Sequence, residues 1–182
     1  MWIWCLIIAA VVVADQITKQ IVVTHLEVGE SVDLIPGVFR FTYVQNEGAA
    51  FGMLSQHRWV FMVISTVAIV ALFVYLWKYR PQSRFACAGL AMVVGGGIGN
   101  MIDRCYLTYV IDFLDFCAFP KVWMWVFNVA DACVCVGGAM LLLWCVVELI
   151  RESRKGKEAP AKTVAEEPVD VGADSADAER NE

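Results

Sequence analysis

The chain has 182 residues, of which 59% are hydrophobic, and its mean hydropathy is +0.62. This composition, with charges in short clusters between long apolar runs, is typical of a polytopic membrane protein and speaks against a soluble domain. The net charge of -5 misleads if applied to the whole chain, because the stretch Glu158–Glu182 is acidic, rich in Ala and without aromatic residues. We expect that stretch to be a disordered tail, and about 155 residues then remain for one bundle.

Four apolar runs predict four membrane-spanning helices. Residues 1–23 would rise roughly 34 Å as a helix, which is enough to cross the hydrocarbon core. The first part of this run, up to Ala14, resembles a signal peptide, but the basic n-region is absent and we expect an uncleaved span. The next three runs are residues 59–77, 85–102 and about 127–150.

The segment between the first two runs contains short stretches of alternating residues. Val38 to Tyr43 is such a stretch, and it predicts a small β element that lies on the bundle. Asn46 follows, with Glu47 and several small residues after it. This part is either an ordinary helix entry or a loop where the backbone closely approaches an extended substrate.

Basic residues predict the orientation in the membrane. Lys78, Arg80 and Arg84 crowd the link between the second and third runs, and four more basic residues follow the fourth run between positions 151 and 157. The positive-inside rule places both clusters, and with them both termini, in the cytoplasm. The loops at about 24–58 and 103–126 then face outward.

Two aspartates next to the apolar runs are candidate functional groups, because an ionisable side chain costs roughly 2.5 to 3.5 kcal/mol to insert into a membrane. Asp112 precedes the fourth helix in an outer loop, and Asp131 lies in the first turns of that helix. Both are therefore near the outer face. Two carboxyl groups within hydrogen-bonding reach share one proton, so that one acts as a base and the other as an acid in peptide hydrolysis.

Sequence spacing alone does not show that these two aspartates meet. Each could instead cap a helix or pair with a basic residue. Asp115 offers a second carboxylate three residues after Asp112, and the pattern does not choose between them. Asn128 lies three residues before Asp131 and shares a helical face with it, so its amide can orient the carboxylate.

Other polar residues gather near the outer ends of the helices. Asn100, Asp103 and Arg104 share one face of the third helix, as a salt bridge with a polar clamp or as a contact to lipid phosphate or a peptide carbonyl. Asp15 and Lys19, four residues apart on the first helix, are placed for an ion pair that would stabilise the bundle.

Glycines and cysteines have packing roles in this interpretation. The glycines before Asn100 permit close approach of apolar helices, and the Lys and Ser or Thr of a phosphate loop do not follow them. The seven cysteines lack the repeated spacing of a zinc site, and we expect no metal site. Cys105 and Cys117, which flank one loop, leave a disulfide open.

Five blocks of the sequence resemble the lipoprotein signal peptidases, also called signal peptidase II, a family of intramembrane aspartic peptidases. The blocks are Asp15–Lys19, Asn46–Phe51, Gly95–Arg104, Val110–Phe113 and Phe127–Asp131. The resemblance spans about residues 1–152, and the last three blocks in this order are highly specific. The tail after about residue 152 has no counterpart in the family.

The resemblance implies a role for each candidate residue. It makes Asp112 and Asp131 the catalytic dyad and sets Asp115 aside. Substrate binding or active-site support is implied for five further residues: Asn46, Asn100, Asp103, Arg104 and Asn128. Asp15 and Lys19 remain structural, and no metal or other cofactor is implied.

The implied reaction removes the signal peptide from prolipoproteins immediately before a cysteine that already carries diacylglycerol. The expected partners are lipidated prolipoproteins and membrane phospholipid, without nucleic acid, and we expect a monomer in the bacterial cytoplasmic (inner) membrane with its active site near the periplasmic face. A small helical transporter or proton-relay protein is the alternative, and it would stagger its carboxylates through the depth of the bilayer.

The expected fold is an all-α membrane protein with two regions. Residues 1–152 form four transmembrane helices with a small extracytoplasmic β element. Residues 153–182 form a disordered, acidic cytoplasmic tail.

Overall fold

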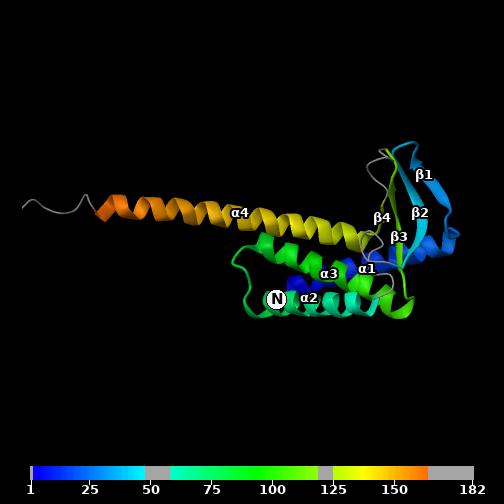
Figure 1. Cartoon of the computed structure of the whole chain (residues 1–182), viewed down its shortest axis with the longest axis horizontal. Coiled ribbons are helices and arrows are strands. Elements are labelled where there is room, and N and C mark those ends of the chain that lie inside the picture. Colours follow the sequence, from blue (N-terminus) through cyan, green and yellow to red (C-terminus); the bar gives the residue numbers. More distant parts are fainter. Residues whose placement is uncertain (1, 48–57, 119–124, 164–182) are drawn as a thin grey trace, which may run out of the picture. The chain divides into compact units, whose positions relative to one another are not determined.

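The computed structural model describes residues 2–47, 58–118 and 125–163, and the chain divides into two compact units, Met1–Trp144 and Cys145–Glu182. Helices and strands alternate in groups along the chain (Figure 1). Their order is α1 (Trp2–His25), β1 (Ser31–Ile35), β2 (Phe39–Asn46), α2 (Arg58–Lys78), α3 (Arg84–Tyr106), β3 (Val110–Phe116), β4 (Val126–Phe127) and α4 (Val129–Thr163).

All four predicted helices form. By length and composition, α1, α3 and residues 129–154 of α4 are apolar enough to cross a membrane. By the same criteria of length and composition, the apolar part of α2 is shorter than these three and covers Met62–Lys78. The structure is therefore mainly helical, with three candidate membrane spans among the described residues.

Helix α3 has neighbours on three sides, and consecutive glycines make the close contacts. A Cβ on Gly95 would lie 2.9 Å from Val11 of α1, and a Cβ on Gly97 would lie 2.8 Å from Ile69 of α2. Between them, Gly96 faces the backbone oxygen of Ala130 in the first turn of α4. Real Cβ atoms do not approach this closely, so the expected packing role of the glycines is confirmed.

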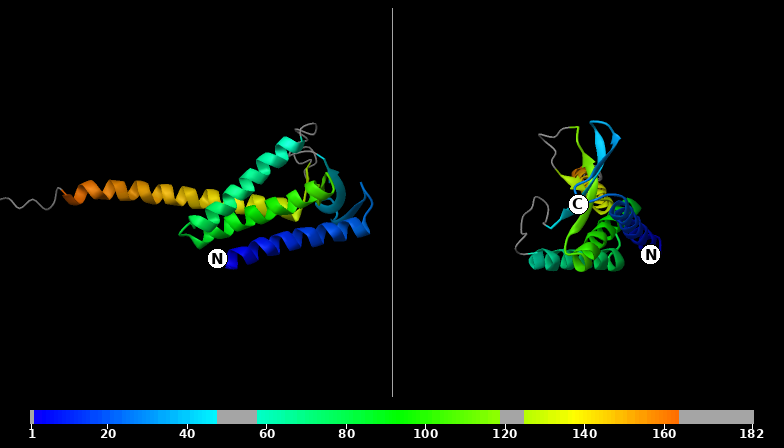
Figure 2. Two further views of the ribbon diagram at one scale, coloured as in Figure 1. Left: turned by 90° about the horizontal axis from the view of Figure 1, so that it is seen from below. Right: turned by 90° about the vertical axis from the view of Figure 1, so that its right-hand side faces the viewer.

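The four strands form one antiparallel sheet in the order β1-β2-β3-β4. The predicted β element is confirmed as β2, and Tyr43 of this strand packs in a buried cluster with Ile111 and Phe113 of β3. Figure 2 shows that α1 and α3 end, and α2 begins, at the end of the bundle where the sheet lies. The sheet therefore closes one end of the helices.

Strand β3 was not predicted, and the placement of Asp112 in a loop was wrong. Asp112 lies on β3, where it is paired with Val44 across the sheet. Carboxylates at positions 112 and 115 interrupt the alternation by which a strand is detected in sequence, whereas pairing with β2 satisfies the backbone of this segment.

The predicted boundary of the tail was also wrong in part. Helix α4 continues to Thr163, so residues 153–163 are helical, while residues 164–182 lie outside the described residues. Lysine, glutamate and alanine in this segment favour a helix, whereas Gly156 and Pro160 disfavour one. Local propensity alone therefore does not explain why the helix extends beyond its apolar part.

Candidate active site

The first turn of α4 fixes one of the two aspartates. Asn128 caps the helix: its Oδ1 accepts a hydrogen bond from the backbone N–H of Asp131 at 2.9 Å. The carboxylate of Asp131 in turn accepts one from the backbone N–H of Asn128 at 3.2 Å. This reciprocal pair is a capping box, so Asn128 precedes the helix instead of lying on its face as predicted. It orients Asp131 through the backbone.

Asp112, the other aspartate, lies on strand β3, and asparagine side chains donate hydrogen bonds to both carboxylates. Asp112 is 2% exposed, and its two oxygens accept hydrogen bonds from Nδ2 of Asn46 at 2.8 Å and Nδ2 of Asn128 at 2.6 Å. Asp131 accepts a further bond from Nδ2 of Asn100 at 2.7 Å. Asn128 therefore donates to both carboxylates, to that of Asp112 from its side-chain amide and to that of Asp131 from its backbone N–H.

Burial gives the Asp112 carboxyl an unusual proton affinity. Its pKa is raised from 3.8 to about 7, mainly because burial removes the water that would solvate the charged form, with the negative charge of Asp131 adding to the effect. The hydrogen bonds from Asn46 and Asn128 act in the opposite direction and limit the rise. Asp112 is thus poised to hold and release a proton near neutral pH.

Both aspartates line one cavity of about 270 Å³. Asn46, Asn100 and Arg104 also line it, and the rest of its lining is mainly apolar. Trp125, which was not predicted to be a site residue, is one of the apolar residues. The cavity therefore combines two carboxylates with a mainly apolar lining, which suits a backbone amide with apolar flanking groups.

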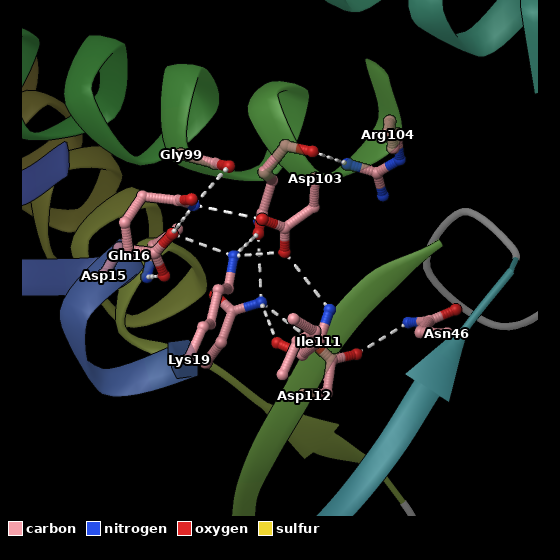
Figure 3. A network of polar contacts seen from close by, with 12 residues as sticks. Asp15, Gln16, Lys19, Asn46, Gly99, Asp103, Arg104, Ile111 and Asp112 are labelled. Atoms are coloured by element: carbon pink, nitrogen blue, oxygen red, sulfur yellow. Dashed lines mark hydrogen bonds and ion pairs between the residues drawn. The ribbon is translucent and has the colours of Figure 1, made fainter. Parts of the chain in front are cut away.

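A buried ion cluster that includes Asp15, Lys19 and Asp103 lies close to Asp112 (Figure 3). The ammonium of Lys19 lies 2.8 Å from Asp15 and 2.8 Å from Asp103, and it donates to Oδ1 of Asn100 at 2.9 Å. The ion pair expected between Asp15 and Lys19 forms. The bond from Lys19 to Asp103 was missed, because rules of helical spacing relate residues on one helix and these two lie on α1 and α3.

Gln16 joins this cluster and was also missed. Its Nε2 donates to Asp103 at 3.0 Å and to the backbone oxygen of Gly99 at 3.2 Å. Arg104, which was grouped with Asp103 in the sequence, donates to the backbone oxygen of Asn100 at 3.3 Å. Its guanidinium is thereby kept at the wall of the cavity.

Asp115 has a different environment from Asp112. Its Oδ2 lies 2.6 Å from Nε of Arg40 and accepts a bond from Thr42 at 2.9 Å, across the β2–β3 pair. The hydrogen bond to Asp115 raises the pKa of the Arg40 guanidinium above its ordinary value. Asp115 is not among the described residues that line the cavity.

Among residues 2–47, 58–118 and 125–163, no three His, Cys, Asp or Glu side chains gather in a way that could hold a metal ion. Cys105 and Cys117 are free thiols. The block at 46–51 is described only up to Glu47, so the remainder of that prediction lies outside the described residues.

Comparison with known proteins identifies the family. The family model described as signal peptidase (SPase) II matches residues 7–147. The chain belongs to the signal peptidase II family. The lipoprotein signal peptidase of Halothermothrix orenii is 41% identical over 139 residues, 76% of this chain and 92% of that protein. That of Halalkalibacterium halodurans is 36% identical over 156 residues, 86% of this chain and 97% of that protein.

The fold agrees with this family assignment. A bacterial membrane enzyme solved by the in meso method at 2.3 Å resolution is 30% identical, with a TM-score of 0.76, over 82% of this chain and 90% of that one. A second such structure, at 1.9 Å resolution, has a TM-score of 0.73. The resemblance found in the five sequence blocks is confirmed, and the chain is a membrane peptidase of the signal peptidase II type.

Proposed function

We propose that the protein is an aspartic endopeptidase that removes signal peptides from diacylglyceryl-modified prolipoproteins, cutting just before the lipidated cysteine. Membership of the signal peptidase II family supports the reaction and its substrates. The observation that carries the mechanism is the placement of Asp112 and Asp131 at one cavity, each held by amide donors.

In the proposed mechanism the dyad holds one proton. Asp112, whose pKa is about 7, carries that proton, and Asp131 is the base. Asp131 takes a proton from a water molecule as its oxygen attacks the scissile carbonyl carbon, and Asp112 gives its proton to the leaving nitrogen as the C–N bond breaks. Arg104, which lines the cavity, stabilises the negative charge that develops on the carbonyl oxygen by donating a hydrogen bond to it.

The supporting residues keep these groups in place in this proposal. Asn46 and Asn128 present donors to Asp112, and Asn100 presents one to Asp131. Asp103 supports the strand next to Asp112 through a bond from the backbone N–H of Ile111 at 3.1 Å. Such fixed donors avoid reorganisation during the reaction.

The proposal places four helices across the bacterial cytoplasmic membrane, with α2 as the fourth span. Both termini are cytoplasmic, as the basic residues after α2 and those that follow the apolar part of α4 favour. The sheet and the cavity then lie near the periplasmic face, because the sheet is at the opposite end of α2 from Lys78. A lipid-bearing cysteine can reach this level while its acyl chains stay in the bilayer.

Residues 1–152 form the peptidase domain in this proposal, and the segment from 153 onward is a cytoplasmic extension that the reaction does not need. The family match ends at residue 147, which supports this division. We further propose that the enzyme acts as a monomer in phospholipid, without a metal or other cofactor.

The test is cleavage of a lipidated precursor by the purified full-length chain in phospholipid vesicles. We expect mass spectrometry to show a product that begins with the diacylglyceryl cysteine, and no product from the same precursor without the lipid. Asp112→Asn protein, reconstituted identically, controls for contaminating peptidases. Failure to cut the lipidated precursor, or equal cutting of both precursors, would contradict the proposed substrate.

A further inference from the structure

Lys19 is separated from the dyad by a single amide, although it is not among the described residues that line the cavity. Its ammonium donates to Oδ1 of Asn100 at 2.9 Å, and Nδ2 of the same asparagine donates to Asp131 at 2.7 Å. The three groups thus form a chain from α1 through α3 to α4. This arrangement raises the question of what the lysine does for Asp131.

The ammonium of Lys19 has no donor to spare. Its side chain is 2% exposed, and its three N–H groups are matched by three acceptors, on Asp15, Asp103 and Asn100. A buried ammonium that loses an acceptor is left with an unsatisfied donor, which is costly. The oxygen of Asn100 is therefore a required ligand of this cation.

This requirement fixes which end of the Asn100 amide faces Asp131. If the amide were flipped, its NH₂ group would face the ammonium of Lys19 and its oxygen would face a carboxylate oxygen of Asp131. Both contacts would be repulsive, because donor would meet donor and acceptor would meet acceptor. With Lys19 in place, only one orientation is favourable, and in it the amide nitrogen donates to Asp131.

The other contact to the Asn100 oxygen is shared and holds it less firmly. Nδ2 of Asn128 lies 2.9 Å from this oxygen, but it also lies 2.6 Å from Asp112 and 3.3 Å from the backbone oxygen of Ile111. An amide nitrogen has two hydrogens for these three acceptors. Lys19 is therefore the main determinant of the orientation of Asn100.

The same ion cluster also holds the backbone on both sides of the dyad. Asp103 accepts a bond from the N–H of Ile111, next to Asp112, and Asp15 accepts one from the N–H of Ala130 at 3.0 Å, next to Asp131. Lys19 joins these two carboxylates. Its position is thus tied to both elements that carry the catalytic candidates.

We propose that Lys19 is a positioning residue of the peptidase reaction, acting on Asp131 through the amide of Asn100. This inference rests on the proposed function and gives Lys19 a part in turnover beyond stabilising the bundle. Replacing a lysine that only stabilised the fold would leave kcat of the folded enzyme unchanged, or would change it independently of Asn100.

A double-mutant cycle on kcat distinguishes these two roles. The four proteins are the wild type, Lys19→Met, Asn100→Ala and the double variant, assayed on the lipidated precursor with the folded fraction of each measured by thermal unfolding. We expect each single change to lower kcat about 100-fold, with KM nearly unchanged, because each removes the directed donor to Asp131. We expect the double variant to lose little more than either single variant. Gln20→Met, on an exposed position of the same helix, is the matched control and should retain wild-type kcat.

Multiplication of the two losses in the double variant, or wild-type kcat in folded Lys19→Met, would overturn the inference. If Lys19→Met does not fold, the cycle is repeated in an Asp103→Asn background, where removing the lysine leaves one buried carboxylate, Asp15, and not two. The same outcomes then decide. A wild-type protein that does not cut the precursor contradicts the proposed function itself, whereas cutting with independent losses contradicts only the role of Lys19.

Discussion

Replacing Gly96 with alanine should move the start of α4 and reduce catalysis without touching a polar residue of the site. The new Cβ would overlap the backbone oxygen of Ala130 and lie 2.9 Å from Cγ2 of Val134. The obstacle is backbone on one side and a branched side chain on the other, so neither can swing away as a long flexible side chain would. The first turn of α4, with Asp131, must therefore shift away from α3.

The size of the effect follows from the geometry. A real Cβ lies at least 3.0 Å from such neighbours, so the backbone of Ala130 must retreat by about half an ångström or more. Overpacking of this kind costs about 1–3 kcal/mol, and alanine in a helix returns at most about 1 kcal/mol relative to glycine. Because misplacement of a reacting group by about 1 Å can cost a factor of about 100, we expect kcat to fall roughly 10- to 100-fold.

The assay is kcat on the lipidated precursor together with the midpoint of thermal unfolding in detergent. Gly138→Ala is the matched control, because a Cβ at Gly138 meets no atom within 4 Å. That variant should keep wild-type kcat and be equally or slightly more stable. Wild-type turnover and stability in Gly96→Ala would show that the contact between α3 and α4 does not position Asp131, and the reasoning would fail.

Three further predictions concern the aspartates and their donors. Asn46→Ala removes a hydrogen bond that lowers the pKa of Asp112. The alkaline limb of the kcat–pH profile, which is set by loss of the Asp112 proton, should therefore move to higher pH. An unchanged limb, or one at lower pH, would contradict the assignment of Asp112 as the acid. Asp112→Asn should gain stability relative to wild type, on the order of a few kcal/mol, as pH rises from about 4 to about 7. The pKa of Asp112 is about 7 in the folded protein and lies above its ordinary value of 3.8, so in this pH range the folded wild type binds more protons than the unfolded wild type and loses stability as pH rises. If the free energy of unfolding changed with pH in the same way for the two proteins, this reasoning would be refuted. Asp115→Asn loses only the partly exposed pair with Arg40, which costs at most about 1 kcal/mol, and should cut the precursor at nearly the wild-type rate.

The sequence predicted the helices and the two aspartates because each leaves a local signal. Long apolar runs identify membrane helices whatever their neighbours, and a carboxylate next to such a run is costly enough to mark Asp112 and Asp131 as candidates. Their placement at one cavity required the fold. Family resemblance supplied the choice of Asp112 over Asp115, and the structure adds that Asp115 is bound to Arg40 across the sheet.

Two of the features that the sequence did not predict depend on contacts between distant segments. Strand β3 forms because β2, more than 60 residues earlier, offers it a partner, as the pairing of Asn46 with Val110 illustrates. The bonds from Lys19 to Asp103 and to Asn100 join different helices, and no rule of helical spacing relates them. The continuation of α4 to Thr163 is a local feature, and it was missed because composition was taken as evidence for disorder and because Gly156 and Pro160 disfavour a helix.

The central claim is that Asp112 and Asp131 act together on the scissile peptide bond, and its most direct test is turnover by two variants that keep the size of the side chain. Asp112→Asn and Asp131→Asn protein, each shown to be folded, would be assayed on the lipidated precursor beside Asp115→Asn as the matched control. We expect both dyad variants to lose at least about 1,000-fold in kcat, because an amide can neither accept the proton from water nor donate one as the acid does, while the control stays near wild type. Processing at the normal rate by either dyad variant would contradict the account.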